Sequence, residues 1–574
     1  MKPISLRRSQ LLNAIWAMHD VKGYLNDADI AQLAILFNLS TVEIEGVVSF
    51  YHFFHRKPSG RHTIYLNNSI MSEFHGFSEV KKAFEKETGA SFGKVDPSGT
   101  FGLFETSCIG LSDQEPSALI DFFPFVDLTP QKVKATIVKL KSGASASSIH
   151  DEPKDNIHYT PGDRAFILKE YEPGAILERL KELSPDEVIR EVKGSGLMGM
   201  GGAFFPAGLK WEACRRNAAN RKFVVCNADE GEPGTFKDRV LLNTMPGLVI
   251  EGMALCAYAV GASEGIIYLR GEYRWLRDKI HQTIKDFRKR GLLGDSVSAK
   301  QFAFDVRIQL GAGAYVCGEE TALLNSLEGK RGEPRTRRYF PVERGYLGMP
   351  TVVSNVETFA CAARTIEQGP ERMRQLGTKD TPGTKLISIS GDCAKPGVYE
   401  IEWGMKVGDL LALCEAENTN YVQVSGPSGV GISMKERNRR LCKEDLMCGG
   451  SFMIFNKERD LLQILLNFSN FFKHESCGIC TPCRAGNFIL NRKLEKLQLG
   501  LGTLRDLTEL EQWGTTIKQN SRCGLGQMAP NSIMDLIHKF PEYFDERVDK
   551  SGSKLIRGFD LETAEKQYEE VVAE

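Results

Sequence analysis

The sequence predicts a multidomain α/β protein with a helical region near each end. Three observations support this prediction. Apolar residues recur at helical spacing over about residues 5–56, short strand and helix signals alternate from about residue 63, and three cysteines within seven residues lie in a second helical region that begins near residue 457. The 574 residues are enough for three or four domains of about 100 to 200 residues each.

The composition is that of an ordinary globular protein, with 42% hydrophobic and 26% charged residues. The formal net charge of −1 gives no electrostatic footprint for nucleic acid. No apolar run approaches the roughly 18 residues that a membrane span requires, and the N-terminal residues show no cleavage signal. Fourteen cysteines, mostly scattered, fit a reducing compartment, so we expect a cytoplasmic protein without a membrane span.

The N-terminal region combines a small helical bundle with a βα layer. The segment Ser40-Thr-Val-Glu43 is a capping-box pattern that opens the third helix. Strands are expected at 63–66, 102–105 and 118–120, and helices at 78–87 and 130–140. The alternation of strands and helices predicts a thioredoxin-like layer. The small polar residues of 141–148 predict a linker and a domain boundary.

A glycine-rich stretch follows the helix predicted at 185–192. Gly194, Gly196 and Gly199 satisfy G-x-G-x-x-G, but a dinucleotide fingerprint follows a strand, so an ordinary Rossmann fold is not expected. Glycines at 199, 201 and 202 leave backbone N–H groups open to a phosphate, and Lys210 adds a positive charge. The alternative is a flexible surface loop, although its aromatic residues would be costly to expose.

An apolar stretch at 223–226 predicts a buried strand. Directly after it come the polar residues Asn227, Asp229, Glu230 and Glu232. Acidic residues clustered in this way usually lie in a solvent-exposed turn. Beside a glycine cradle, their carboxylates suit the ribose hydroxyl and amide N–H groups of a nucleotide, because carboxylates accept hydrogen bonds.

The cysteine motif in the second helical region predicts a metal centre. Cys477, Cys480 and Cys483 form C-x2-C-x2-C, and Cys523 is the best candidate for a fourth ligand of a [4Fe–4S] cluster. Structural zinc and unligated thiols are the alternatives. His474 is expected to lie outside the ligand set.

Longer motifs resemble a known family. The segments 311–322, 334–341 and 348–358, together with those above, resemble the flavoprotein subunit of respiratory NADH dehydrogenase over about residues 157–545. The resemblance implies FMN, NADH and a [4Fe–4S] cluster. It implies FMN contacts from Gly199, Gly201, Gly202, Lys210, Asn227, Asp229, Glu230, Tyr315, Gly318, Glu319, Ser354, Asn355 and Thr358, and NADH contacts from Phe205, Lys210, Glu232, Glu320 and Phe340.

Two features of this resemblance carry further expectations. Glu232 favours NAD over NADP, because a carboxylate repels a 2′-phosphate. The chain has Met200, Phe204 and Ser354 where the family usually has Arg, Gly and Asn. A lost cation is expected to alter flavin binding or potential, and the bulk of Phe204 to narrow the approach of the nucleotide.

The N-terminal region resembles the small thioredoxin-fold subunit of the same enzyme, through segments at 23–25, 48–51 and 108–110. That family binds a [2Fe–2S] cluster through four cysteines. The matching positions here are Asn67, Ser72, Cys108 and Ser112. With one thiol left, we expect no [2Fe–2S] cluster in this domain.

These features give one domain scheme. Residues 1–140 form a helical bundle plus thioredoxin-like domain, 141–156 a linker, 157–380 a Rossmann-like but non-classical FMN and NADH domain, 381–456 a β-grasp domain that resembles the same family, 457–548 a helical [4Fe–4S] domain, and 549–574 a tail.

The fusion of these modules closely resembles the large diaphorase subunits of cytoplasmic NAD-reducing [NiFe] hydrogenases. The resemblance implies transfer of electrons between NAD(H) and a ferredoxin-like small diaphorase subunit, and from there to a hydrogenase pair. The alternatives are the flavoprotein subunit of an NAD-dependent formate dehydrogenase or of respiratory NADH dehydrogenase. A non-catalytic scaffold stabilised by a metal is the alternative from another class.

Overall fold

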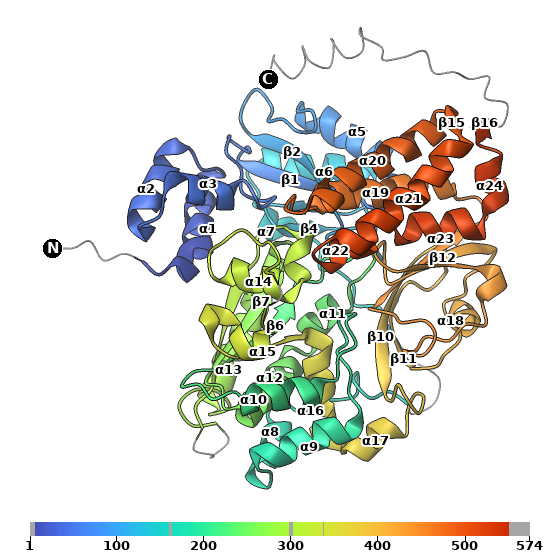
Figure 1. Cartoon of the computed structure of the whole chain (residues 1–574). Coiled ribbons are helices and arrows are strands. Elements are labelled where there is room, and N and C mark those ends of the chain that lie inside the picture. Colours follow the sequence, from blue (N-terminus) through green and yellow to red (C-terminus); the bar gives the residue numbers. More distant parts are fainter. Residues whose placement is uncertain (1–5, 160–163, 298–301, 337, 550–574) are drawn as a thin grey trace.

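The computed structural model describes residues 6–159, 164–297, 302–336 and 338–549. Within them lie two four-stranded sheets, a six-stranded sheet and a C-terminal group of helices (Figure 1). Of the tail predicted at 549–574, residues 550–574 lie outside the described part of the chain.

The N-terminal region is a helical layer followed by a sheet in the order β2-β1-β3-β4. Asn26 and Ser40 close capping boxes at the starts of α2 and α3. Strand β1 runs parallel to β2 and antiparallel to β3, as in the predicted thioredoxin-like layer. The elements are α1 Leu11–Lys22, α2 Asp27–Phe37, α3 Thr41–Val48, β1 His62–Asn67, α4 Ile70–Phe74, α5 Phe77–Thr88, β2 Phe101–Thr106, β3 Ala118–Ile120, β4 Phe123–Phe125 and α6 Pro130–Lys141.

The segment predicted as a linker contains a helical turn, α7 Ala146–Ile149. Ala146 is buried in the core of the N-terminal sheet, and Ile149 packs against the same core. The segment is therefore held by contact with the N-terminal domain, since its own small residues bury little apolar surface.

The second sheet is parallel throughout, in the order β8-β7-β6-β9. Its central strands, β6 and β7, are almost wholly buried, and helices α12 and α16 pack against the sheet, as is usual for parallel sheets. The elements are α8 Ala175–Glu178, α9 Pro185–Ser195, α10 Ala207–Arg216, β6 Phe223–Ala228, α11 Lys237–Thr244, α12 Pro246–Val260, β7 Glu264–Leu269, α13 Arg277–Lys289, β8 Asp305–Leu310, α14 Glu320–Leu327, α15 Pro341–Arg344, β9 Thr351–Asn355, α16 Val356–Gln368 and α17 Pro370–Arg374.

The six-stranded sheet has the order β13-β12-β14-β10-β11-β5. Strand β5 pairs with β11, so the first residues of the range predicted for FMN and NADH binding belong to this sheet instead. The linker therefore leads into an edge strand. The elements are β5 Ile157–Tyr159, β10 Thr384–Gly391, β11 Gly397–Glu402, α18 Val407–Leu413, β12 Thr419–Val424, β13 Val430–Ser433 and β14 Ser451–Asn456.

The C-terminal region is a group of helices closed by a short parallel strand pair. It lies between the N-terminal sheet and the six-stranded sheet in Figure 1. In the described residues, no single helix has the length and apolar composition of a membrane span. The elements are α19 Leu461–Glu475, α20 Thr481–Gln498, β15 Gly502–Thr503, α21 Leu504–Asn520, α22 Gly524–Met528, α23 Asn531–Lys539, α24 Pro541–Asp545 and β16 Val548–Asp549.

The N-terminal helices are docked on the parallel sheet. The indole N–H of Trp16 donates to the carbonyl of Gly311 at 3.2 Å, and the backbone N–H of Phe53 donates to Ala312 at 3.1 Å. Apolar residues of both regions and of the six-stranded sheet form one continuous core. The loop after β8 is therefore held against the N-terminal region by two hydrogen bonds.

Candidate functional site

The predicted site begins where β6 and β9 end. Asn227 and Asn355 are directly paired in register on these neighbouring parallel strands, at the carboxyl ends where such sheets bind ligands. The Asn227 amide donates to the Gly318 carbonyl at 2.8 Å. The Asn355 side chain accepts from the Glu357 N–H at 3.0 Å and so caps α16. Both strand ends are therefore fixed, and the loop at Gly318 is drawn to them.

The glycine-rich loop is a tight hairpin above these strand ends. The Gly199 N–H donates to the Phe205 carbonyl at 2.9 Å, and the Met200 N–H donates to the Thr358 hydroxyl at 2.9 Å. A Cβ at Gly201 would lie 3.1 Å from the Cβ of Asn355, so a side chain at this position would press on the strand end. The predicted phosphate cradle thus lies directly beside Asn355.

Lys210 lies on α10, the helix that follows this hairpin. Its ammonium is 3.2 Å from a carboxylate oxygen of Glu320 and donates to the Val353 carbonyl at 3.0 Å. Two predicted NADH contacts are open to solvent, since Phe205 is 51% exposed and Phe340 is 62% exposed. Phe340 precedes α15, which packs against α10. The two exposed rings therefore offer apolar surface to a ligand.

Of the acidic residues after β6, Glu230 is buried and Asp229 and Glu232 are half-buried, so the solvated turn considered above does not occur. Burial raises the pKa of Asp229, and it raises the pKa values of Glu230 and Glu232 to about 7. The Glu230 carboxylate accepts from the N–H groups of Asp238 and Arg239 at 2.8 and 3.1 Å. Glu230 therefore holds the first turn of α11.

The remaining acidic and polar candidates also have structural partners. Glu319 caps α14 by accepting from the N–H groups of Thr321 and Ala322, both at 2.9 Å. Glu232 accepts from the Tyr315 hydroxyl at 2.5 Å and from the Ser428 N–H at 2.9 Å. Ser354 is nearly buried on β9. Glu232 thus connects the site to the turn between β12 and β13.

A buried charge cluster under the strand ends is not evident from the sequence. Lys237 is 2.7 Å from Asp238 and 2.9 Å from Glu357, and Lys385 contacts Glu357 as well. Burial alone would raise the pKa of Glu357, but the two lysines lower it. The Asn355 amide donates to Asp238 at 2.6 Å, so the cluster supports the site directly. A lysine inside the otherwise uncharged strand β10 is the available signal.

The four predicted cluster ligands lie in one small core. Cys477 and Cys480 lie between α19 and α20, Cys483 lies in the first turn of α20, and Cys523 directly precedes α22. All four pack in the same apolar cluster, with Val316. Burial raises the pKa of Cys483 to about 11, and the thiols of the other three cysteines add to this shift.

The surroundings of these thiols fit an iron–sulfur cluster by donor chemistry. The Asn487 amide donates to the Cys483 sulfur at 3.4 Å, and the Ser476 hydroxyl is 3.3 Å from it. Hydrogen bonds to sulfur are a means by which proteins tune such clusters. Among the described residues, no three His, Cys, Asp or Glu groups are already arranged to hold one metal ion. The fit therefore rests on four thiols gathered in one core.

Glu475 joins the cysteine loop to the predicted flavin site. Its carboxylate accepts from the Tyr315 N–H at 2.9 Å and from the Ser107 hydroxyl at 3.0 Å. The Tyr315 ring also packs on Phe471 of α19, with ring centroids 4.9 Å apart. Glu475 lies two residues before Cys477. The cysteine loop is therefore in direct contact with the loop that follows β8 and contains Tyr315. The sequence marks this residue only as an acid next to the cysteine motif.

Phe204 directs its bulk into the protein core. Its side chain is 6% exposed and packs on Trp403, with ring centroids 5.7 Å apart. Met200 is buried, and its carbonyl accepts from the Lys385 ammonium at 3.1 Å. A cation thus reaches the loop from β10, although position 200 carries none.

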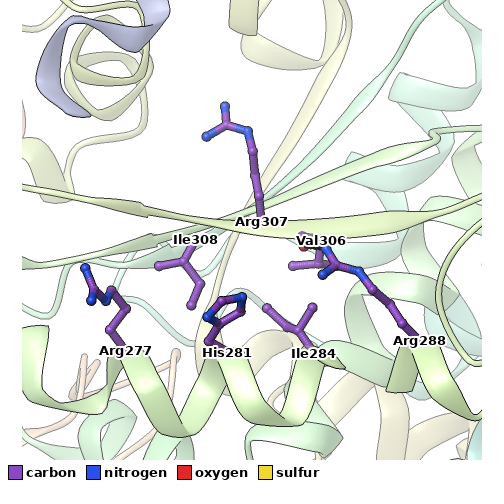
Figure 2. Close-up of a pocket in the computed structure, with 7 residues that line it drawn as sticks. All are labelled: Arg277, His281, Ile284, Arg288, Val306, Arg307 and Ile308. Atoms are coloured by element: carbon purple, nitrogen blue, oxygen red, sulfur yellow. Dashed lines mark hydrogen bonds between the residues drawn. The ribbon is translucent and has the colours of Figure 1, made fainter. Parts of the chain in front are cut away.

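A separate pocket lies between α13 and β8, the edge strand of the parallel sheet (Figure 2). Arg307 points to the other side of the strand from the helix in Figure 2, and Arg288 is paired with Asp305 at 2.9 Å. This strand is two positions from β6, so the pocket is distinct from the site above. Its lining residues are Arg277, His281, Ile284, Arg288, Val306, Arg307 and Ile308.

Three described families match segments of the chain. The family described as Nuo51 FMN-binding domain matches residues 192–364, and the NADH-ubiquinone oxidoreductase-F iron-sulfur binding region matches 463–547. The family described as thioredoxin-like [2Fe-2S] ferredoxin matches 2–141. Together these matches and the sheets confirm the predicted multidomain α/β fold class, with its thioredoxin-like, FMN-binding and iron–sulfur parts.

The third match corrects one prediction. The sequence leads us to expect no [2Fe–2S] cluster in the N-terminal domain, and the match to a [2Fe–2S] ferredoxin family contradicts that expectation. The positions Asn67, Ser72, Cys108 and Ser112 are all buried, and the Cys108 sulfur is 3.3 Å from the Ser112 hydroxyl. This donor set, with its single thiol, does not match four-cysteine ligation, and the electron path proposed below does not pass through it.

Similar proteins cover nearly the whole chain. A solved structure of an NAD+-reducing [NiFe]-hydrogenase in the H2-reduced state contains a chain that is 36% identical, with a TM-score of 0.91, 99% of this chain covered and 97% of that one. An NADH-quinone oxidoreductase subunit of Aquifex aeolicus is 39% identical over 66% of this chain and 89% of its own. The NAD-reducing hydrogenase HoxS subunit alpha of Cupriavidus necator is 46% identical over 98% of this chain and 96% of its own. The chain therefore belongs to the family of the alpha subunits of NAD-reducing hydrogenases.

Proposed function

We propose that this chain is the diaphorase subunit of an NAD-reducing [NiFe] hydrogenase, which exchanges hydride with NAD(H) and electrons with its partner subunits. When bound, FMN supplies the exchange between a hydride and single electrons, and a [4Fe–4S] cluster carries those electrons one at a time. The observation that carries the proposal is the contact between Tyr315 and Glu475, which joins the predicted flavin site to the cysteine loop.

In this proposal, separate groups of residues bind FMN, NADH and the [4Fe–4S] cluster. Gly199, Gly201 and Gly202 present backbone to the FMN phosphate, and Asn227 and Asn355 hold the strand ends beside it. The other FMN contacts in this proposal are Lys210, Asp229, Glu230, Tyr315, Gly318, Glu319, Ser354 and Thr358. NADH stacks on the exposed Phe205 ring, with Lys210, Glu232, Glu320 and Phe340 around it. Cys477, Cys480, Cys483 and Cys523 hold the cluster.

The partners follow from the relatives. We propose that electrons pass between this chain and a ferredoxin-like small diaphorase subunit, and between that subunit and a [NiFe] hydrogenase pair. The relative that matches nearly the whole chain is a subunit of an NAD-reducing hydrogenase, which favours this assembly over a formate dehydrogenase. We also propose a cytoplasmic location, since no disulfide joins any of the fourteen cysteines, as is usual in a reducing compartment.

Cofactor analysis of the purified chain tests the proposal. We expect one FMN per chain, at least the roughly four irons of one [4Fe–4S] cluster, and reduction of a one-electron dye by NADH. Zinc without flavin would instead support a scaffold, and dye reduction that survives removal of the flavin would contradict the mechanism. Chains that co-purify with a tagged copy identify the assembly: hydrogenase subunits support it, and formate dehydrogenase subunits contradict it.

A further inference from the structure

The glycine-rich hairpin is attached to the six-stranded sheet at three points. The Lys385 ammonium on β10 donates to the Met200 carbonyl at 3.1 Å. Gly202 faces Gly449, where a Cβ on Gly449 would lie 3.6 Å from the Gly202 Cα. The Phe204 ring packs on Trp403, which directly follows β11. Three separate segments in or beside one sheet thus contact three loop residues that lie within five consecutive positions.

Phe204 occupies a backbone conformation that its residue type disfavours. Its φ is +52°, in the left-handed region where a Cβ costs roughly 1–2 kcal/mol. Such a conformation persists only where the surroundings fix it. Here the ring is buried against Trp403, itself 2% exposed, in an edge-to-face arrangement with an interplanar angle of 64°. Burial of this ring therefore offsets the backbone strain.

The same backbone conformation determines where the next side chain points. Phe205 follows Phe204 and is 51% exposed, whereas Phe204 is buried. The Phe205 carbonyl accepts from the Gly199 N–H at 2.9 Å, and Met198 is bridged to Pro206. A shift of Phe204 would therefore move the exposed ring, while the Met200 N–H, which donates to the Thr358 hydroxyl at 2.9 Å, keeps the cradle in place.

We propose that Phe204 is a positioning residue, whose ring is held by Trp403 so that the hairpin presents Phe205 to NADH. This inference rests on the proposed NADH site and assigns the six-stranded sheet a part in nicotinamide binding. The effect falls on binding of the nucleotide, because Phe204 itself touches neither the nucleotide nor the reacting atoms.

Kinetics of NADH oxidation with a one-electron dye test the proposal in the full chain. Phe204→Gly removes the ring and the strain together, so the variant is expected to fold. The KM for NADH should rise about three- to tenfold, the range that one aromatic pair supplies, while kcat and bound FMN stay unchanged. Trp403→Leu should give the same rise, and Trp403→Phe, which retains an aromatic partner, should restore a KM within about twofold of wild type.

The double variant Phe204→Gly/Trp403→Leu should match either single variant, because both remove one contact. Phe302→Ala is the matched control: it removes another aromatic contact of the same region, with Tyr258 at 5.1 Å, and should leave KM unchanged. An unchanged KM in Phe204→Gly, additive effects in the double variant, or loss of FMN and kcat at constant KM would overturn the proposal. A wild-type chain without NADH oxidation would contradict the proposed function instead.

Discussion

The parallel sheet and the six-stranded sheet serve one site in different ways. At the parallel sheet, Asn227 and Asn355 stand at strand ends and face the cradle themselves. At the six-stranded sheet, Lys385 and Trp403 contact the loop that forms the cradle, and Lys385 also neutralises Glu357 beneath it. The difference teaches that the parallel sheet carries the proposed binding groups at its strand ends, whereas the six-stranded sheet carries groups that hold the loop.

We expect the largest effect from a substitution that removes a contact between the six-stranded sheet and the glycine-rich hairpin. Lys385→Met removes one of two buried cations beside Glu357 and leaves the cluster with excess negative charge. We expect a loss of about 3 kcal/mol in local stability, because an uncompensated buried charge is costly. Hydrogen exchange of the β10 amides measures this loss. Lys395→Met, which breaks the exposed pair with Glu415, is the control and should change little; equal effects would refute the distinction.

The pH dependence of stability tests the residue that bridges the two sheets. Burial raises the pKa of Glu232 to about 7 in the folded chain. A raised carboxyl pKa contributes stability that is complete below the unfolded pKa near 4.5 and is lost as pH rises towards 7. Without NADH, the wild type should therefore lose stability relative to Glu232→Gln over this window, by about tenfold in the unfolding constant per pH unit. Urea titrations at several pH values measure the free energy of unfolding of both proteins. If Glu232 titrated normally, the difference between the wild type and Glu232→Gln would be the same at every pH.

A smaller effect is expected from one binding group at the parallel sheet. Asn227→Ala removes the hydrogen bond to the Gly318 carbonyl and one proposed FMN contact. FMN affinity should fall about tenfold, as expected for one lost hydrogen bond. Titration of FMN into flavin-depleted protein measures it. Asn217→Ala, which removes amide contacts on the far end of α10, is the control and should leave the affinity unchanged.

Local sequence patterns are sufficient to predict part of the fold and part of the candidate site. The spacing of Cys477, Cys480 and Cys483 and the strand that ends at Asn227 are short-range patterns, and the structure places both where they are expected. The contacts that join the parts are long-range. Tyr315 and Glu475 are 160 positions apart, and Lys385 and Met200 are 185 apart.

No periodicity encodes these long-range pairs, because they depend on how the sheets and helices pack. The conformation of Phe204 is a similar case. Its sequence position shows only a bulky residue where a glycine is usual, and the left-handed backbone with the Trp403 contact comes from the tertiary structure. The error about the [2Fe–2S] cluster has another source, since that expectation rests on the number of thiols alone.

Rapid mixing of NADH with the wild type and with Cys480→Ser tests the central claim most directly. The wild type should show bleaching of both flavin and iron–sulfur absorption. The variant should retain FMN and its bleaching by NADH, while it loses about four irons and the absorption that they contribute, because Cys480 belongs to the cysteine core and not to the flavin loops. A variant with the iron content of the wild type, or flavin that is lost together with the iron, would contradict the account.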